Sequence, residues 1–425
     1  MLDHKINRIR CLFFLWIENI RSFVIRQSIF ITLSRFSDIG FGFIFWIFAT
    51  HLFSMEDVGI ATAFISSLGL IMLFSRFGFD STIIRYIPLL GKGPVIITST
   101  IILTLSSVIV GVLFLVLIPF ISPSLILIQS FSVIFLLFVI ANSLYLTTGI
   151  SFIGIREAKV RFAENLFLGL RIPLIFIFTG LGVIGIFCSY GLAYVIAAFF
   201  GIIMLKRYVA FKYRIDTGFI KESMKFNVSN YIASIFQTIP PLLLPLLILN
   251  VAGGEDAAKY FIALSIANIL LIIPDAIGTA FMVEGSHGSP LRLNAFRSVI
   301  GIYSVLVPCI VAFFLFGGML LGLFGPKYVE SLELLRLFVV ATLFIAMYNF
   351  FIPLQYVRMR VSSVILSNCA LMIVLLSLSY VFLTTMGLIG VGLAYLISYS
   401  LAAVFILIWV WKKGWMKESV DQTRI

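Results

Sequence analysis

Apolar residues along this 425-residue chain are concentrated in long runs, and short polar connections separate the runs. A helix that crosses the hydrocarbon core of a bilayer needs about 20 mostly apolar residues. Runs near that length lie at residues 28–50, 58–78, 95–118, 125–148, 165–183, 186–205, 226–250, 260–283, 298–323, 332–353, 364–384 and 388–411. The pattern therefore predicts an all-α, polytopic membrane protein with about 12 transmembrane helices.

The second half of the chain resembles the first half. The sequence GVIGIFCSYGLAYVI begins at Gly182 and GLIGVGLAYLI begins at Gly387, each between the last two runs of its half. The acidic pairs 56–57 and 255–256 precede the second helix of each half. Because each half contains six crossings, both copies enter the membrane in the same orientation. We expect two six-helix lobes related by an internal repeat, with an axis along the membrane normal.

This repeat sets the predicted domain organisation. We interpret residues 1–26 as a cytoplasmic amphipathic segment rather than a signal peptide, because charged residues and no small-residue cleavage site follow its apolar stretch. The other predicted parts are an N-lobe at 27–205, a cytoplasmic linker at 206–225, a C-lobe at 226–411 and a cytoplasmic tail at 412–425.

Composition and charge support a membrane protein. Hydrophobic residues make up 61% of the chain and charged residues 11%, too few charges to cover a water-facing surface. The net charge of +12 does not indicate nucleic acid, since all but five of the 30 Lys and Arg residues lie in alternate connections on one side. Lys259 and Lys327 lie on the other side. The positive-inside rule predicts that both termini are cytoplasmic. We expect the protein in the cell (inner or plasma) membrane.

Polar residues recur on the first helix of each predicted half. Arg35 and Asp38 are three residues apart and share one helix face. The offset of 199 between the acidic pairs maps them onto Ser234 and Gln237. The polar face of the seventh helix comprises Asn227, Asn230, Ser234 and Gln237. A self-neutralising intrahelical pair is the alternative interpretation of Arg35 and Asp38.

The second helix of each half has a polar face as well. Arg76 and Asp80 map onto Asp275 and Thr279, and the face of the eighth helix continues through Ser265 and Asn268. Because charges at bilayer depth cost several kcal/mol, we expect the four helices to line one wet central cavity. The alternative for Arg76 and Asp80 is snorkelling at the cytoplasmic interface.

Three prolines lie in the seventh predicted helix, at Pro240, Pro241 and Pro245. Each removes a backbone donor, so we expect a kinked or interrupted helix. Such a bend could serve as a hinge for alternating access, and simple packing is the alternative.

The chain offers no pattern typical of catalysis, metal binding or a cofactor. His4, His51 and His287 are scattered without metal-ligand spacing, and the four cysteines are far apart. The glycines of a GxGxxG sequence that starts at Gly180 lie in an apolar run with no strand before them. We therefore expect neither an enzyme nor a bound cofactor.

Several segments resemble a known family. The segment EDVGIATAFISSLGLIMLFSRFGFDSTIIRYIPLL from Glu56 is similar to the second-helix signature of polysaccharide (O-antigen-type) flippases, which belong to the multidrug/oligosaccharidyl-lipid/polysaccharide (MOP) superfamily. The segments ALSIANILLIIPDAIGTAFMVEGSH from Ala263 and LLGLFGPKYVESLELLRLF from Leu320 are similar to later parts of the same family. The resemblance implies a V-shaped, two-lobe transporter with a cationic central cavity.

The resemblance also implies a substrate. Such proteins turn lipid-linked oligosaccharides, sugars on a polyprenyl diphosphate, from the cytoplasmic to the outer leaflet for surface polysaccharide biosynthesis. Arg35 and Arg76 are the candidate diphosphate ligands, because guanidinium groups match phosphate oxygens. Asp38 and Asp275 are candidates for proton or coupling-ion binding. The expected partners are the glycan lipid, membrane lipids and other polysaccharide-assembly membrane proteins, without nucleic acid.

Two other functions remain open at this point. A drug or cation exporter of the same superfamily has the same fold, and acidic cavity residues would favour it over arginines. A membrane polymerase or ligase of lipid-linked sugars is the second alternative, although the outer connections are too short for the catalytic loop that such enzymes generally carry.

Overall fold

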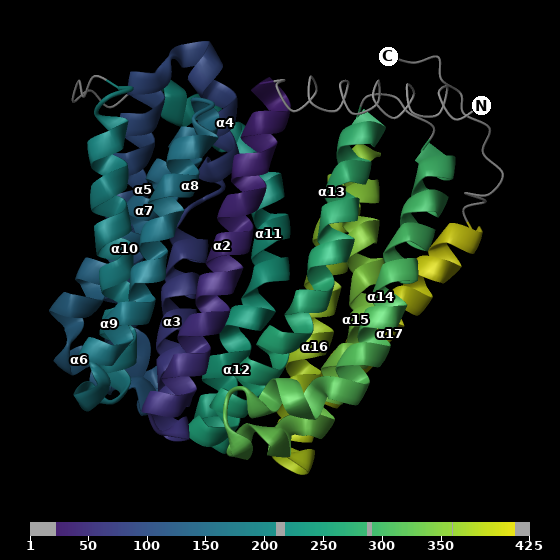
Figure 1. The fold of residues 1–425 in the computed structure, drawn as a ribbon. Helices are drawn as coiled ribbons and strands as arrows, with labels where there is room; N and C mark the ends of the chain where they lie inside the picture. The colour runs from purple at the N-terminus through teal and green to yellow at the C-terminus, as the bar shows by residue number, and fades with distance from the viewer. Residues whose placement is uncertain (1–22, 210–216, 287–290, 359, 413–425) are drawn as a thin grey trace, which may run out of the picture. The chain divides into compact units, whose positions relative to one another are not determined.

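The computed structural model describes residues 23–209, 217–286, 291–358 and 360–412, and all regular elements in these ranges are helices (Figure 1). Of the predicted amphipathic segment at 1–26, residues 1–22 lie outside the described residues. The same holds for residues 210–216 of the predicted linker and residues 413–425 of the predicted tail. The all-α prediction is confirmed.

The first half of the chain forms nine of these α-helices. They are α2 (Phe23–Leu52), α3 (Met55–Ser75), α4 (Phe79–Leu90), α5 (Lys92–Ile121), α6 (Leu127–Ser130), α7 (Ser132–Gly154), α8 (Ala158–Leu166), α9 (Arg171–Ile177) and α10 (Val183–Leu205). The second half forms α11 (Thr217–Ala252), α12 (Gly254–Asn268), α13 (Ile272–Ser286), α14 (Leu291–Gly322), α15 (Leu332–Val357), α16 (Val361–Met386) and α17 (Leu388–Lys412).

Eleven helical segments in the described residues are long and apolar enough to cross a membrane. They correspond to all the predicted crossings except the fifth. The expected continuous helix at 165–183 is instead α8, a 3-10 turn at Phe167–Leu170, α9 and a second 3-10 turn at Thr179–Leu181. Gly169 explains the first break in part: a Cβ there would lie 3.1 Å from the Phe41 ring, so α2 approaches this backbone closely.

The second predicted helix ends earlier than expected. α3 stops at Ser75, and Phe77 and Gly78 have φ of 47° and 74°, which turns the chain before α4 begins. The expectation that Arg76 and Asp80 both lie on the second membrane helix is therefore wrong. Arg76 belongs to the turn and Asp80 to the first turn of α4.

The chain divides into two compact units. Unit 1 comprises Met1–Leu52, Ile71–Leu117 and Leu127–Val228, and unit 2 comprises Phe53–Leu70, Ile118–Ile126 and Ser229–Ile425. In unit 1, aromatic and aliphatic side chains around Phe152 and Phe219 form one buried cluster. In unit 2, Tyr348 and Phe351 lie in a buried cluster of α11, α15, α16 and α17. Within a membrane, close van der Waals packing of such side chains stabilises each unit internally, because lipid tails are as apolar as the core.

Equivalent glycines begin the last helix of each half. Gly182 precedes α10 with φ 55° and ψ −138°, and Gly387 precedes α17 with φ 67° and ψ −153°. Only glycine adopts this backbone conformation readily. The two copies of the repeat therefore begin with the same turn, which supports the predicted duplication.

The prolines do not interrupt the seventh crossing. α11 is one helix of 36 residues that continues through Pro240, Pro241 and Pro245. The predicted interruption is therefore absent, and the role of these residues as a hinge stays a prediction.

Candidate functional site

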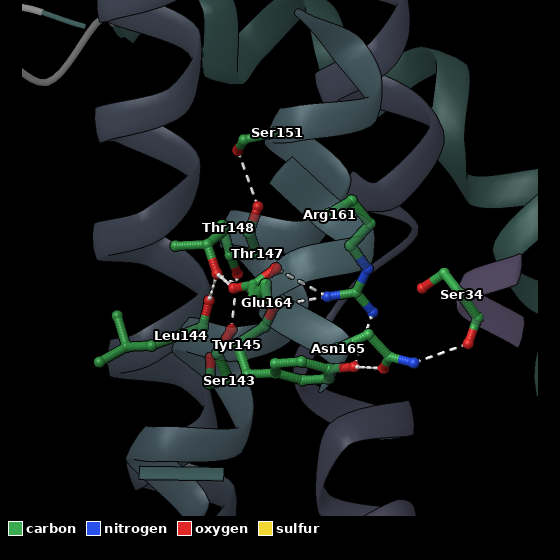
Figure 2. Close-up of polar contacts among 10 residues, drawn as sticks. All are labelled: Ser34, Ser143, Leu144, Tyr145, Thr147, Thr148, Ser151, Arg161, Glu164 and Asn165. Carbon is green, nitrogen blue, oxygen red and sulfur yellow. Dashed lines mark hydrogen bonds and ion pairs between the residues drawn. The ribbon is translucent and has the colours of Figure 1, made fainter. Parts of the chain in front are cut away.

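A buried polar cluster joins three helices of unit 1 (Figure 2). The Tyr145 hydroxyl on α7 donates to Oδ1 of Asn165 on α8 at 2.6 Å. Nδ2 of Asn165 donates in turn to the Ser34 carbonyl on α2 at 2.6 Å. Tyr145 and Asn165 are both buried, so each bond forms away from water and fixes the relative position of the helices.

An ion pair extends this cluster. Nη1 of Arg161 lies 2.9 Å from Oε2 of Glu164, and Nη2 donates to the Tyr145 hydroxyl at 2.9 Å (Figure 2). The Arg161 guanidinium also lies 4.4 Å from the centre of the Tyr145 ring. Glu164 is fully buried and accepts a further hydrogen bond from the Thr148 hydroxyl. A charge pair at such burial is tolerated only because its hydrogen bonds are nearly complete.

A second ion pair lies on α2 and α9. Nη2 of Arg171 donates to the Asp38 carbonyl at 2.9 Å and lies 3.1 Å from Asp38 Oδ1. Arg171 is the first residue of α9, directly after the 3-10 turn. The intrahelical pair considered for Arg35 and Asp38 is therefore wrong, because Asp38 is bound from another helix. Arg35 is exposed and forms no ion pair within the described part of the chain.

Arg76 is held by Asp80. Its Nε donates to Asp80 Oδ2 at 2.9 Å, and Nη2 contacts Asp80 Oδ1. Arg76 is buried, whereas the Asp80 side chain is 47% exposed. Burial and the positive charge of Arg161 lower the pKa of Arg76 to about 10, so its guanidinium stays charged at neutral pH.

Unit 2 repeats the hydrogen-bonded part of the cluster without the charges. The Tyr348 hydroxyl donates to Asn368 Oδ1 at 2.6 Å, and Asn368 Nδ2 donates to the Ala233 carbonyl at 2.9 Å. Tyr348 and Asn368 follow Tyr145 and Asn165 by 203 residues in both cases. At the same offset, Arg161, Glu164 and Thr148 correspond to Val364, Ser367 and Phe351. The duplication thus retained the tyrosine–asparagine scaffold, and only the first half carries the buried ion pair on it.

The predicted polar residues of unit 2 are mostly exposed. Ser234, Gln237 and Asn268 are exposed, and Ser265 is half-buried. The side chains of Asn227 and Asn230 lie outside the described residues. The role of all these positions as cavity-lining ligands stays a prediction.

Asp275 has a partner that the sequence pattern did not identify. Its Oδ1 accepts a hydrogen bond from Nδ2 of Asn349 on α15 at 3.0 Å, and its backbone carbonyl accepts one from the Thr279 hydroxyl at 2.8 Å. The Asp275 carboxylate is exposed on α13. It is therefore positioned by an amide and accessible to a cation or a proton.

The cluster around Tyr145 was not predicted from the sequence. Arg161 and Glu164 fall between the predicted crossings at 125–148 and 165–183, whereas both residues lie in α8. A signal was present, because a tyrosine followed 20 residues later by an asparagine recurs in both halves at the same offset. Among the described residues, no group of three or more His, Cys, Asp and Glu side chains is arranged to hold a metal ion.

No protein-family model matches the chain, and no curated protein matches it in sequence. Solved structures do match. An inward-facing multidrug resistance MATE family transporter of the MOP superfamily is 16% identical, with a TM-score of 0.72 over 93% of this chain and 100% of that one. An outward-facing one is 17% identical, with a TM-score of 0.61 over 92% and 95%.

A third similar structure is a MOP superfamily transporter from Pyrococcus furiosus whose binding pocket has reverse polarity. It is 17% identical, with a TM-score of 0.60 over 93% of this chain and 96% of that one. At these identities the likeness establishes the fold. The chain is a multi-pass membrane protein with the two-lobe fold of MOP superfamily transporters.

Proposed function

We propose that this protein is a transporter that moves a lipid-linked oligosaccharide, a sugar on a polyprenyl diphosphate, from the cytoplasmic to the outer leaflet by alternating access. The step serves surface polysaccharide biosynthesis at the cell membrane, with both termini in the cytoplasm. It is not enzymatic. The glycan lipid is the substrate, and other polysaccharide-assembly membrane proteins are the proposed partners.

The fold supports the transport part of this proposal. Solved structures with the same fold are described as transporters in both inward-facing and outward-facing conformations. Alternating access between such conformations moves a solute without a continuous pore. An oligosaccharide diphosphate requires this help, because its hydroxyl and phosphate groups would lose their hydrogen bonds in hydrocarbon.

The positive charge of Arg35 on α2 is the observation that supports an anionic substrate. Arg171 already binds the Asp38 carboxylate, while Arg35 is exposed near the middle of the same helix as Asp38. This stretch of unit 1 therefore has surplus positive charge. An exposed arginine at bilayer depth is stable only beside water or an anion, and its planar guanidinium fits a diphosphate.

Arg76 is the second candidate ligand. Because Arg76 is buried and bound to Asp80, a diphosphate would have to displace that carboxylate. We therefore assign the first contact to Arg35. Asp38 and Asp275 remain the candidates for proton or coupling-ion binding, and both are exposed carboxylates beside a fixed donor.

A drug or cation exporter is the second candidate function. The exposed Asp275 carboxylate favours it, as do the similar folds of multidrug MATE transporters. The two functions differ in the sign of the charge that binds the substrate, so Arg35 and Asp275 separate them.

The test is translocation of a fluorescent polyprenyl-diphosphate oligosaccharide in proteoliposomes, measured as loss of access to an added glycosidase. We expect the wild-type protein and Arg336→Ala to translocate and Arg35→Ala to fail with normal membrane insertion. Arg336 is a matched control because it pairs with Glu333 at 2.6 Å in its own helix. Unimpaired translocation by Arg35→Ala would remove Arg35 from the site.

A further inference from the structure

Unit 2 contains an apolar pocket that the proposed function does not use. It has a volume of about 920 Å³ and lies between α14, α15 and α17. α14 and α17 both pack against α15, whose residues Ala346 and Phe350 form part of the lining between them. The volume is at the upper end of the range for small-molecule sites.

The lining of this pocket is almost entirely apolar. Arg292 is the one charged residue among the side chains that form the pocket, and nearly all the others are aliphatic or aromatic. The hydroxyl of Tyr303, a polar group at the inner end, donates to the Leu343 carbonyl at 2.8 Å. The interior therefore suits a hydrocarbon chain, since a polar solute would lose its hydrogen bonds there.

The dimensions of the pocket match one leaflet of a bilayer. On α14 the lining extends from Arg292 to Tyr303, which is roughly 17 Å at the rise of an α-helix. Half of a typical hydrocarbon core is about 15 Å. Arg292 lies in the first turn of α14, at the end of the helix that the distribution of Lys and Arg predicts to be cytoplasmic. The Arg292 charge thus lies at the depth of a lipid headgroup, and the apolar lining extends over the depth of an acyl chain in one leaflet.

The pocket is open to the membrane. Phe296 on α14 and Leu407 on α17 line it and are 66% and 57% exposed. In a multi-pass protein, large apolar side chains that are exposed within the membrane-crossing helices are typical of a lipid-facing surface. A lipid can therefore enter sideways from the bilayer.

We propose that this pocket binds one anionic phospholipid, with an acyl chain between α14 and α17 and the phosphate at Arg292. Charge complementarity selects an anionic headgroup over a zwitterionic one. Arginine donors suit the phosphate oxygens. The site is independent of the transported substrate, because binding requires no translocation.

Native mass spectrometry of the full chain in detergent tests the proposal, with dioleoylphosphatidylglycerol and dioleoylphosphatidylcholine as the probes. We expect one tightly retained phosphatidylglycerol in the wild-type protein. Arg292→Gln should weaken it by roughly tenfold, to the level of phosphatidylcholine. Val299→Trp, which fills the pocket, should abolish retention of both lipids.

Two variants on the same helix are controls. Arg297→Gln removes an exposed arginine that does not line the pocket, and Val307→Trp adds the same indole outside it. Both should retain phosphatidylglycerol as the wild type does. Failure of the wild type to retain it would mean that another part of the chain fills the pocket, and would overturn the proposal. Equal retention by Val299→Trp and Val307→Trp would overturn it as well.

Discussion

Asp38 on α2 is bound by Arg171 on α9, whose Nη2 lies 3.1 Å from Asp38 Oδ1. The Arg171 side chain is 4% exposed and the Asp38 side chain 50% exposed. The Asp38 carboxylate is therefore paired with a buried arginine of unit 1, and its other side is exposed. As a consequence, the charge of Arg35 one turn earlier is not cancelled by its own helix, and the proposed anionic substrate depends on this surplus.

The pairing predicts different effects for two neighbouring substitutions. Asp38→Asn leaves Arg171 buried beside a neutral amide and should destabilise the protein by about 1–3 kcal/mol. Arg35→Ala should change the free energy of unfolding by less than about 0.5 kcal/mol, since Arg35 is exposed. Thermal unfolding in detergent measures both. Equal stabilities would show that the Asp38 contact does not hold α9 on α2.

The buried ion pair of α8 predicts a rescue. Glu164→Gln leaves the Arg161 charge without its carboxylate and should cost about 3–5 kcal/mol. The double variant Arg161→Val with Glu164→Ser copies the second half of the chain, where Val364 and Ser367 occupy these positions. Because it removes both charges, it should be more stable than Glu164→Gln in the same unfolding measurement. A double variant that is less stable than the single one would contradict the equivalence of the two scaffolds.

The repeated tyrosine–asparagine scaffold predicts similar losses of stability when its asparagine is replaced in either unit. Asn165→Ala and Asn368→Ala each remove an amide that accepts from a tyrosine and donates to a backbone carbonyl. Each should lower the free energy of unfolding by about 1–3 kcal/mol. Asn268→Ala, at an exposed asparagine, serves as the control. An unchanged melting temperature for either of these two variants would mean that its hydrogen bonds do not contribute to stability.

The turn before α17 gives a prediction about the backbone alone. At Gly387, φ is 67° and no heavy atom lies within 4 Å of the position that a Cβ would occupy, so Gly387→Ala introduces strain without a clash. We expect a loss of about 1–3 kcal/mol. Gly180→Ala is the matched control, because that site is equally open and its φ is not positive. Equal melting temperatures for the two variants would contradict this assignment.

The hydrophobic pattern was enough to predict most of the fold. Eleven of the 12 predicted runs correspond to a helical segment in the described residues that is long enough to cross a membrane, because hydrocarbon leaves the backbone no other way to satisfy its hydrogen bonds. The fifth crossing was not predictable in this way. Its break at Phe167–Leu170 depends on how closely α2 packs against Gly169, which is a tertiary contact.

The candidate site was harder to predict. Arg161 and Glu164 are three residues apart, a spacing that is equally typical of an exposed helix face, and only burial distinguishes the two cases. The partner of Asp38 lies 133 residues away, so the nearer Arg35 was considered first. The internal repeat was the most informative signal, because it aligned polar positions that no local pattern relates.

The most direct test of the proposed function compares two substrates in the same proteoliposomes: a fluorescent polyprenyl-diphosphate oligosaccharide and a fluorescent organic cation. We predict that the wild-type protein translocates the glycan lipid and not the cation, and that Arg35→Glu abolishes glycan translocation. Export of the cation by the wild-type protein, with no movement of the glycan lipid, would contradict the flippase function and support a cation exporter that depends on Asp275.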